Sequence, residues 1–329
     1  MLRVKFSTIV PAAVVALGFA VSSYANEGGA TEVVHERPIE TRTYRSMGGG
    51  PVRAFAVQGT TLWYATNDAL VTQATGGARN QNQQTFPRMG NISAAGITSI
   101  VIDPMGRIWV GTPEGVAVRV GTNFTSYTTE NGLPDNNVLS IAAGSGGEVW
   151  VGTEKGAARF RDNSWTAFTT AEGLPGDRVQ ALAADSRGRI WFGTNRGAAV
   201  YNGTKFEVFD MRGRHFRNNN VKVLSVEPGT DAIWAAVGPR FAYRFDGKEW
   251  REYMDVADNI TSIMNDTRRT WFGHSEGVTR FSEVGGWVRD PAMHGVQVQQ
   301  AFSMHRDANG NLWFGKEDGV LWMNNPYRR

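Results

Sequence analysis

The sequence repeats itself with a period that few folds can use. A tryptophan followed two residues later by glycine occurs five times, and two looser copies have alanine in place of that glycine. Neighbouring copies are 37 to 46 residues apart, a period typical of propeller blades and of helical repeats. The seven tryptophans are Trp63, Trp109, Trp150, Trp191, Trp234, Trp271 and Trp313.

The pattern inside each repeat distinguishes these two possibilities. Before the tryptophan, a short apolar stretch ends in Asp-x-x-Gly, as at Asp103–Gly106 and Asp185–Gly188, which suits a turn between two strands. After the tryptophan come a turn that ends in glycine, a third apolar stretch and an aromatic residue such as Phe124 or Trp165. Four short β-prone stretches leave no space for a sustained helical period. The sequence therefore predicts an all-β, seven-bladed β-propeller of four-stranded blades.

The chain ends before the last blade has received its fourth strand. The outer aromatic residue of that blade would fall near residue 328, and the sequence ends at Arg329. A spare segment, residues 37–46, precedes the first blade. We expect this N-terminal strand to pair with Gly319–Asn324 and complete the last blade, which leaves no free strand edge between the termini. An insertion in the first blade, residues 75–84, moves its outer aromatic residue to Phe86.

The first 25 residues have the features of a secretory signal peptide. Arg3 and Lys5 precede an apolar run that is shorter than the roughly 20 residues of a membrane-spanning helix, and Ser23–Ala25 fits the cleavage pattern. Cleavage after Ala25 is favoured over retention as a membrane anchor. The predicted organisation is a signal peptide at 1–25 and a propeller at 26–329, with no transmembrane segment in the mature chain. We expect the protein in the periplasm or outside the cell.

Composition excludes several kinds of site and partner. The chain has no cysteine, so disulfides, zinc–thiolate sites and cysteine nucleophiles are excluded. Removal of residues 1–25 takes away two of the 34 basic residues and none of the 31 acidic ones. A protein so close to neutral has no general attraction for nucleic acid. The histidines lack ligand spacing, and the Asp-Gly turns lack the alternating acids of a calcium loop. We predict no metal, no cofactor and no catalytic set.

Two adjacent repeats carry a family resemblance. They read GLPDNNVLSIAAGSGGEVWVGTEKGAARF at Gly132–Phe160 and GLPGDRVQALAADSRGRIWFGTNRGAAVY at Gly173–Tyr201. Their succession of Gly-Leu-Pro, an apolar strand, a turn and Trp-x-Gly-Thr resembles the two-component regulator propeller repeat. In that family the repeats form periplasmic sensor regions, commonly followed by a membrane helix and an output domain. This sequence has neither after the repeats, so the resemblance implies binding of a ligand or partner rather than signalling.

One face of the predicted ring collects the loops that differ between blades. The middle loop, between the second and third strands of a blade, shares this face with the loop from the outer strand to the next inner strand. We call this face the rim. Varied loops on a rigid scaffold are a usual place for binding. The middle loops bring to the rim Glu114, Lys155, Arg196, Arg240, His274, Glu276, Lys316 and Asp318.

The loop that leaves the fourth blade is the most distinctive part of the rim. Residues 210–220, DMRGRHFRNNN, lack the Gly-Leu-Pro of the equivalent loops and are rich in arginine. Arginine suits bidentate recognition of carboxylate or phosphate. The loop therefore predicts an acidic ligand or protein partner: an anionic glycan, a lipid head group or an acidic protein face. The predicted binding residues on the rim are Arg196, Arg212, Arg214, His215, Arg217, Arg240, His274 and Glu276.

Three functions remain open from the sequence. The first is an exported, non-catalytic binding propeller. The second is a lyase or lactonase, which needs acid and base groups converging near the axis of the ring. His274 with Glu276 is the one such pair, and a solvated loop histidine is the other interpretation of His274. The third is a structural subunit of an envelope complex, which needs an apolar patch on the outer strands. The sequence does not indicate the ligand or the oligomeric state.

Overall fold

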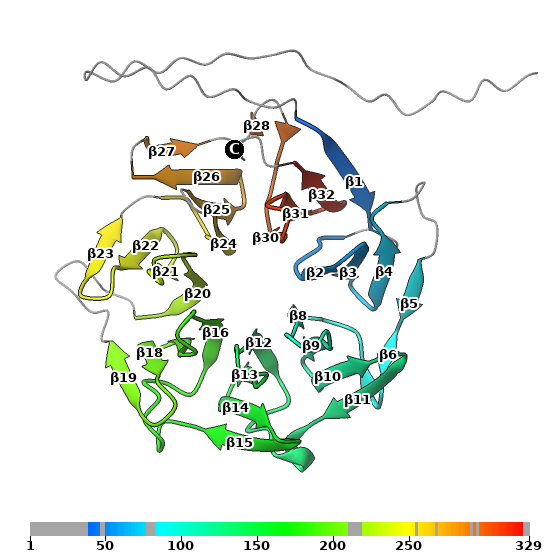
Figure 1. Cartoon of the computed structure of the whole chain (residues 1–329), viewed down its shortest axis with the longest axis vertical. Coiled ribbons are helices and arrows are strands. Elements are labelled where there is room, and N and C mark those ends of the chain that lie inside the picture. The colour runs from blue at the N-terminus through cyan, green and yellow to red at the C-terminus, as the bar shows by residue number, and fades with distance from the viewer. Residues whose placement is uncertain are drawn as a thin grey trace, which may run out of the picture.

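The computed structural model describes residues 39–46, 50–76, 83–209, 219–253, 256–266, 269–283, 285–289, 292–293 and 296–324. Seven four-stranded antiparallel sheets within these residues are arranged as blades around a common axis (Figure 1). This confirms the predicted all-β, seven-bladed propeller. The predicted signal peptide and residues 77–82 of the first-blade insertion lie outside the described residues.

The first four blades follow the chain from the axis outward. Blade 1 contains β2 (Phe55–Gln58), β3 (Thr61–Ala65), β4 (Leu70–Ala74) and β5 (Gln84–Phe86). Blade 2 contains β8 (Ser99–Ile102), β9 (Ile108–Thr112), β10 (Gly115–Val120) and β11 (Asn123–Tyr127). Blade 3 contains β12 (Val138–Ala143), β13 (Val149–Thr153), β14 (Gly156–Arg161) and β15 (Ser164–Phe168). Blade 4 contains β16 (Val179–Ala184), β17 (Ile190–Thr194), β18 (Gly197–Tyr201) and β19 (Phe206–Phe209).

The last three blades continue the ring. Blade 5 contains β20 (Val221–Val226), β21 (Ile233–Val237), β22 (Phe241–Phe245) and β23 (Trp250–Tyr253). Blade 6 contains β24 (Ser262–Asn265), β25 (Thr270–His274), β26 (Gly277–Ser282) and β27 (Gly286–Arg289). Blade 7 contains β30 (Ser303–Arg306), β31 (Leu312–Lys316), β32 (Gly319–Met323) and β1 (Thr41–Arg45). Short additional pieces are β6 (Arg88–Met89), β7 (Ile92–Ser93), β28 (Ala292–Met293), β29 (Val296–Gln297) and the 3-10 turn η1 (Thr129–Asn131).

The N-terminal strand closes the ring as predicted. Strand β1 pairs antiparallel with β32, and Thr41 lies opposite Met323. The backbone N–H of Glu40 donates to the Asn324 side chain at 2.8 Å, which extends the pairing beyond the strand. The Tyr44 ring stacks on the blade anchor Trp313 with centroids 5.7 Å apart. Both hydrogen bonding and aromatic packing therefore hold the two ends of the chain in one sheet.

Each tryptophan anchor packs between its own blade and the next one. Trp109 and Trp191 have no exposed surface, and Trp150 is 1% exposed. The Trp109 ring lies 5.2 Å from the Phe160 ring of blade 3, measured between centroids. A Cβ atom added to Gly111 would lie 2.5 Å from Val138 of that blade, so glycine is required for the blades to approach this closely.

In blades 2, 4 and 7, the aspartate six residues before the tryptophan does more than form the predicted turn. Trp109 donates its indole N–H to the Asp103 carboxylate at 2.8 Å, and the same carboxylate accepts the backbone N–H of Arg107. Blades 4 and 7 repeat the bond from tryptophan to aspartate at 3.1 and 2.9 Å. The carboxylate thus satisfies a buried indole N–H that would otherwise lose its hydrogen bond on folding.

Removal of the closing strand should destabilise the ring. We expect deletion of residues 36–46 to lower the melting temperature by about 5 °C or more, or to cause aggregation, because β32 becomes a free edge. Deletion of residues 26–35 is the matched control, since it shortens the same end and keeps β1. Equal melting temperatures for the two deletions, measured by circular dichroism, would contradict closure by β1.

Replacement of Asp103 by Asn should destabilise the protein in a pH-dependent way. Burial raises the pKa of Asp103, but hydrogen bonds from Trp109 and Arg107 outweigh it, so the pKa lies below its ordinary value of 3.8. The stabilisation is therefore present above about pH 4 and disappears as the pH falls through the folded-state pKa. We expect a loss of about 1.5–3 kcal/mol at neutral pH. Urea unfolding should show a smaller deficit near pH 3, and a pH-independent deficit would argue against a charged Asp103.

Candidate functional site

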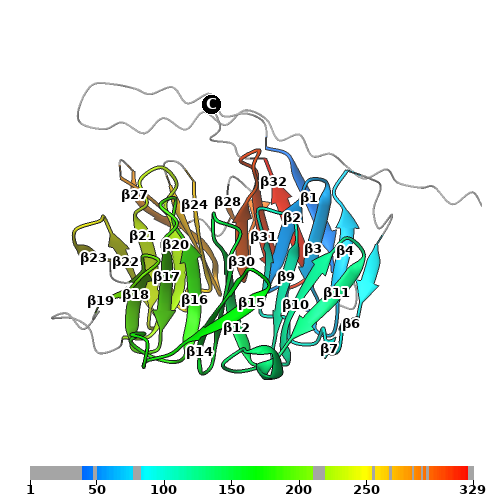
Figure 2. The ribbon, with the colours of Figure 1, turned by 60° about the horizontal axis from the view of Figure 1, so that its bottom comes forward.

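The rim and the chain ends lie on opposite faces of the ring. The middle loop of blade 7 connects β31 to β32 and therefore lies beside Gly319, which pairs with Arg45. Thr41 and Met323 lie at the other end of these strands. Figure 2 shows the ring from the side, with η1 on the rim, far from the entry of β1. A partner on the rim would therefore not collide with the described chain ends.

Several charged residues of the rim form ion pairs, either between two loops or within one loop. Lys155 of the blade 3 middle loop lies 3.0 Å from Asp135 in the loop that enters this blade. Arg240 lies 2.8 Å from Asp258, and Lys316 lies 3.6 Å from Asp318. These pairs are largely exposed, so each contributes at most about 1 kcal/mol to stability. Their main effect is to reduce the number of rim charges that are available to a partner.

The predicted arginines fall into three groups. Arg196 is exposed, and no acidic side chain pairs with it in the part of the chain that the structure describes. The Arg240 side chain is half-exposed and paired with Asp258. The remaining predicted residues of this sector lie outside the described residues, and their role stays a prediction: Arg212, Arg214, His215 and Arg217.

The interpretation of His274 as a solvated loop histidine is wrong, because its exposure is 4%. Its Nδ1 accepts the backbone N–H of Glu276 at 3.3 Å, and its Nε2 lies 3.1 Å from the Thr279 hydroxyl. Thr112 has the same place in blade 2, where its hydroxyl accepts the N–H of Glu114. Burial lowers the pKa of His274, which keeps the ring neutral and able to accept at Nδ1. His274 therefore caps a hairpin turn.

An open groove lies on the rim between blades 6 and 7. Its volume is about 590 Å³. Three of its residues, Glu276, Lys316 and Asp318, are rim residues that the sequence identified. The others come from the same hairpins and from the loop that enters blade 7, where Gln300 has a φ of 52°. The groove residues are Ser275, Glu276, Gln299, Gln300, Lys316, Glu317 and Asp318.

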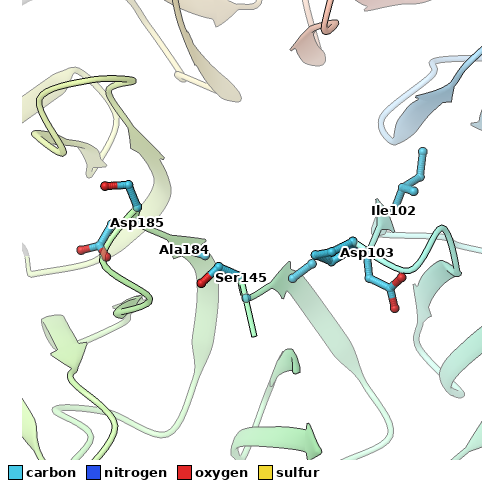
Figure 3. Close-up of a pocket in the computed structure, with 9 residues that line it drawn as sticks. Ile102, Asp103, Ser145, Ala184 and Asp185 are labelled. Carbon is cyan, nitrogen blue, oxygen red and sulfur yellow. The ribbon is translucent and has the colours of Figure 1, made fainter. Parts of the chain in front are cut away.

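A second hollow of about 400 Å³ lies on the opposite face, near the axis of the ring (Figure 3). The first turns of blades 2, 3 and 4 surround it. Its two carboxylates, Asp103 and Asp185, are bound to indole and arginine groups and are not free to act as acid or base. The lining residues are Ile102, Asp103, Pro104, Ala143, Gly144, Ser145, Ala184, Asp185 and Ser186.

The described residues lack two features. No group of three or more His, Asp or Glu side chains among them is placed to hold a metal ion. The same residues contain no helix with the length and apolar character needed to cross a membrane.

Three of the repeats match a known family. Residues 91–114, 132–155 and 173–196 match the model of the two component regulator propeller. The resemblance seen in the sequence is therefore confirmed at these repeats. No curated protein matches the chain.

Several solved propellers are similar in structure. The extracellular domain of a hybrid two component system from B. thetaiotaomicron has a TM-score of 0.70 and 18% identity, over 88% of this chain and 41% of that one. Virginiamycin B lyase from Staphylococcus aureus has a TM-score of 0.70 and 14% identity, over 87% and 99%. YCF48 from Cyanidioschyzon merolae has a TM-score of 0.64 and 14% identity, over 88% and 99%. The chain spans about two fifths of the extracellular domain, and identities this low show the fold alone.

The role of His274 as a turn cap can be tested by two substitutions. We expect His274→Thr to keep the melting temperature within about 3 °C of the parent, because threonine caps the equivalent turns. His274→Ala should cost about 1 kcal/mol or more, because the Glu276 N–H loses its acceptor. Thermal unfolding measures both. Equal losses for the two variants would show that the cap is not the main contribution of His274.

Proposed function

We propose that this chain, which carries two component regulator propeller repeats, is a non-catalytic propeller that binds a ligand or protein partner through its rim. The observation that supports this most directly is that the rim is built from loops that differ between blades, among them the loops of the groove between blades 6 and 7. The groove belongs to the loops that vary between blades, whereas the tryptophan framework beneath them is constant. A fixed framework with varied loops is well suited to recognition.

The charged groups of the described residues favour binding over catalysis. A lyase or lactonase would need an acid and a base that converge on one point. His274 uses both ring nitrogens within its own hairpin, and Glu276 contacts it through the backbone N–H. The carboxylates of the axial hollow are held by indole and arginine groups. The lyase from S. aureus shares the fold, and its activity is not transferred by that likeness.

The outer surface gives little support to the role of a structural subunit. Large exposed apolar side chains among the described residues are Met105, Val120, Val208 and Trp287. They belong to blades 2, 4 and 6 rather than to one continuous surface. A stable envelope assembly would need a larger connected apolar patch.

An extracytoplasmic location fits the remaining observations. The N-terminal sequence predicts export, and the similar domain from B. thetaiotaomicron is extracellular. Because the described chain ends leave the ring on the face opposite the rim, the rim stays accessible if either end is attached to another structure. We place the protein in the periplasm or outside the cell.

The charge distribution of the rim favours an acidic partner over blades 4 and 5. Arg196 and Lys222 are exposed there, and neither has an acidic partner among the described residues. Glu276 and Glu317 are exposed in the adjoining sector of the rim, at blades 6 and 7. An acidic surface would be attracted to the first sector and repelled by the second, which fixes its orientation. The predicted arginines of residues 210–217 would add to the attraction.

The proposal can be tested by removing charge from one face at a time. We expect the combined change Arg212→Ser, Arg214→Ser and Arg217→Ser to weaken capture of an acidic partner from an envelope extract about tenfold or more, with little change in melting temperature. Capture by the parent should also weaken steeply with added salt.

The matched control removes three basic residues from hairpins on the opposite face. Arg161→Ser, Lys205→Ser and Lys248→Ser together change the net charge equally, and all three residues are exposed. This variant should capture the partner as the parent does. Equal losses for both triple variants would show that binding depends on net charge rather than on the rim.

A further inference from the structure

The rim of blade 4 lacks an ion pair that the rim of blade 3 has. In blade 3, Asp135 follows Gly-Leu-Pro in the entering loop and pairs with Lys155 of the middle loop at 3.0 Å. The entering loop of blade 4 has the same Gly-Leu-Pro, followed by Gly176. Its middle loop has Arg196 at the position of Lys155. The cation is retained in blade 4, and the carboxylate is replaced by glycine.

The position of Gly176 is the one that an acidic partner of Arg196 would need. A Cβ atom added to Gly176 would lie 3.1 Å from the Cβ and 3.2 Å from the Cγ of Arg196. It would also lie 2.5 Å from the amide oxygen of the Asn195 side chain. The equivalence of the two loops therefore holds in three dimensions as well as in the sequence.

The backbone of Arg196 is held firmly although its side chain is exposed. Its N–H donates to the Thr194 hydroxyl at 3.1 Å, and its carbonyl accepts from the Asn219 side chain at 3.2 Å. Gln180 donates to Asn220, which precedes β20, and exposed Lys222 lies in β20 of blade 5. The hairpin that carries Arg196 is therefore held in place by a side-chain amide, and the next blade supplies a second exposed cation.

The neighbouring pair shows that this geometry stabilises a carboxylate. Burial raises the pKa of Asp135, but the N–H of Asn137 and the Lys155 ammonium outweigh it and hold the pKa below its usual value. Arginine can pair in the same way and has additional N–H donors for a bidentate contact. Blade 4 supplies the cation without the carboxylate.

We propose that Arg196 is a docking point for a carboxylate of an acidic protein segment, which occupies the position that Asp135 has in the neighbouring pair. This inference rests on the proposed function and assigns one contact of its acidic partner. A protein carboxylate is favoured over a glycan because sites for small molecules are lined mainly by hydrophobic and aromatic side chains. The large exposed apolar side chains of the described residues include one aromatic ring, Trp287, which lies on the outer strand of blade 6.

Four variants separate this contact from general charge. Arg196→Ser removes the cation. Gly176→Asp supplies the missing carboxylate from within the chain, and its backbone lies outside the left-handed region. The flexible Asn195 side chain has to move for it, and the Cβ and Cγ atoms of Arg196 have to shift by a few tenths of an ångström. Lys155→Ser is the matched control, because it removes an equal charge from the pair that is already satisfied. Gly176→Ala adds the same Cβ without charge and tests for steric effects.

The probe is a hexaglutamate peptide, and binding is measured by isothermal titration calorimetry. We expect Arg196→Ser and Gly176→Asp each to raise the Kd about three- to tenfold. Lys155→Ser and Gly176→Ala should stay within about twofold of the parent. Hexaglutamine should not bind, and added salt should weaken hexaglutamate binding.

Four results would overturn the inference. The first is that the parent does not bind hexaglutamate. The second and third are equal losses of affinity for Lys155→Ser and Arg196→Ser, or for Gly176→Ala and Gly176→Asp. The fourth is that a galacturonate hexamer binds more tightly than hexaglutamate. The last result would assign the site to an anionic glycan. If the rim triple variant loses its envelope partner while Arg196→Ser and Gly176→Asp retain it, the proposed function stands and this contact is wrong.

Discussion

The contact between each tryptophan and the following blade is the interaction on which the whole ring depends. A four-stranded blade is too small to bury both of its faces, so it is stable only beside its neighbours. The ring of Trp109 fills the space against Phe160, and Gly111 allows Val138 to approach the same strand. Because every blade needs a neighbour on both sides, the first and last must also meet. Pairing of β1 with β32 satisfies that requirement.

This framework leaves the rim loops free to differ, within limits set by their hairpins. The middle turns need an acceptor for one backbone N–H, and Thr112 and His274 both supply it. A side chain that looks chemically important in the sequence can therefore have only this local role. The residues that remain free for recognition are those whose side chains are neither caps nor members of an ion pair. Arg196 and Lys222 meet this condition among the described residues.

The fold was predictable from the sequence because a tryptophan recurs at a nearly constant spacing in all seven blades, followed in five of them by the same glycine and in several by matching turn residues. The missing outer strand and the spare N-terminal segment were sufficient to predict closure. The site was less predictable, because the partners of its charges lie in other loops, as for Lys155 with Asp135 and Arg240 with Asp258. The burial of His274 was also missed, since the pattern marks a turn but not which side chain caps it. The signal that could have predicted this cap is the histidine at the position where blades 2, 3 and 4 have threonine.

Comparison of the blades with one another shows where the loss of an acid from the repeat leaves a charged side chain without a partner in the part of the chain that the structure describes. Glycine replaces an acid at two positions of the repeat, Gly144 in blade 3 and Gly176 in blade 4. A Cβ atom added to Gly144 would collide with the carboxylate of Glu148, so an acid of the same turn already fills that space. Glu148 does not take over the role of the aspartate, because the buried indole N–H of Trp150 has no hydrogen-bond partner among the described residues. A Cβ atom added to Gly176 would collide with the amide oxygen of Asn195, so a neutral side chain rather than a described acid lies beside that position. The second change leaves Arg196 as an exposed cation that a partner can neutralise.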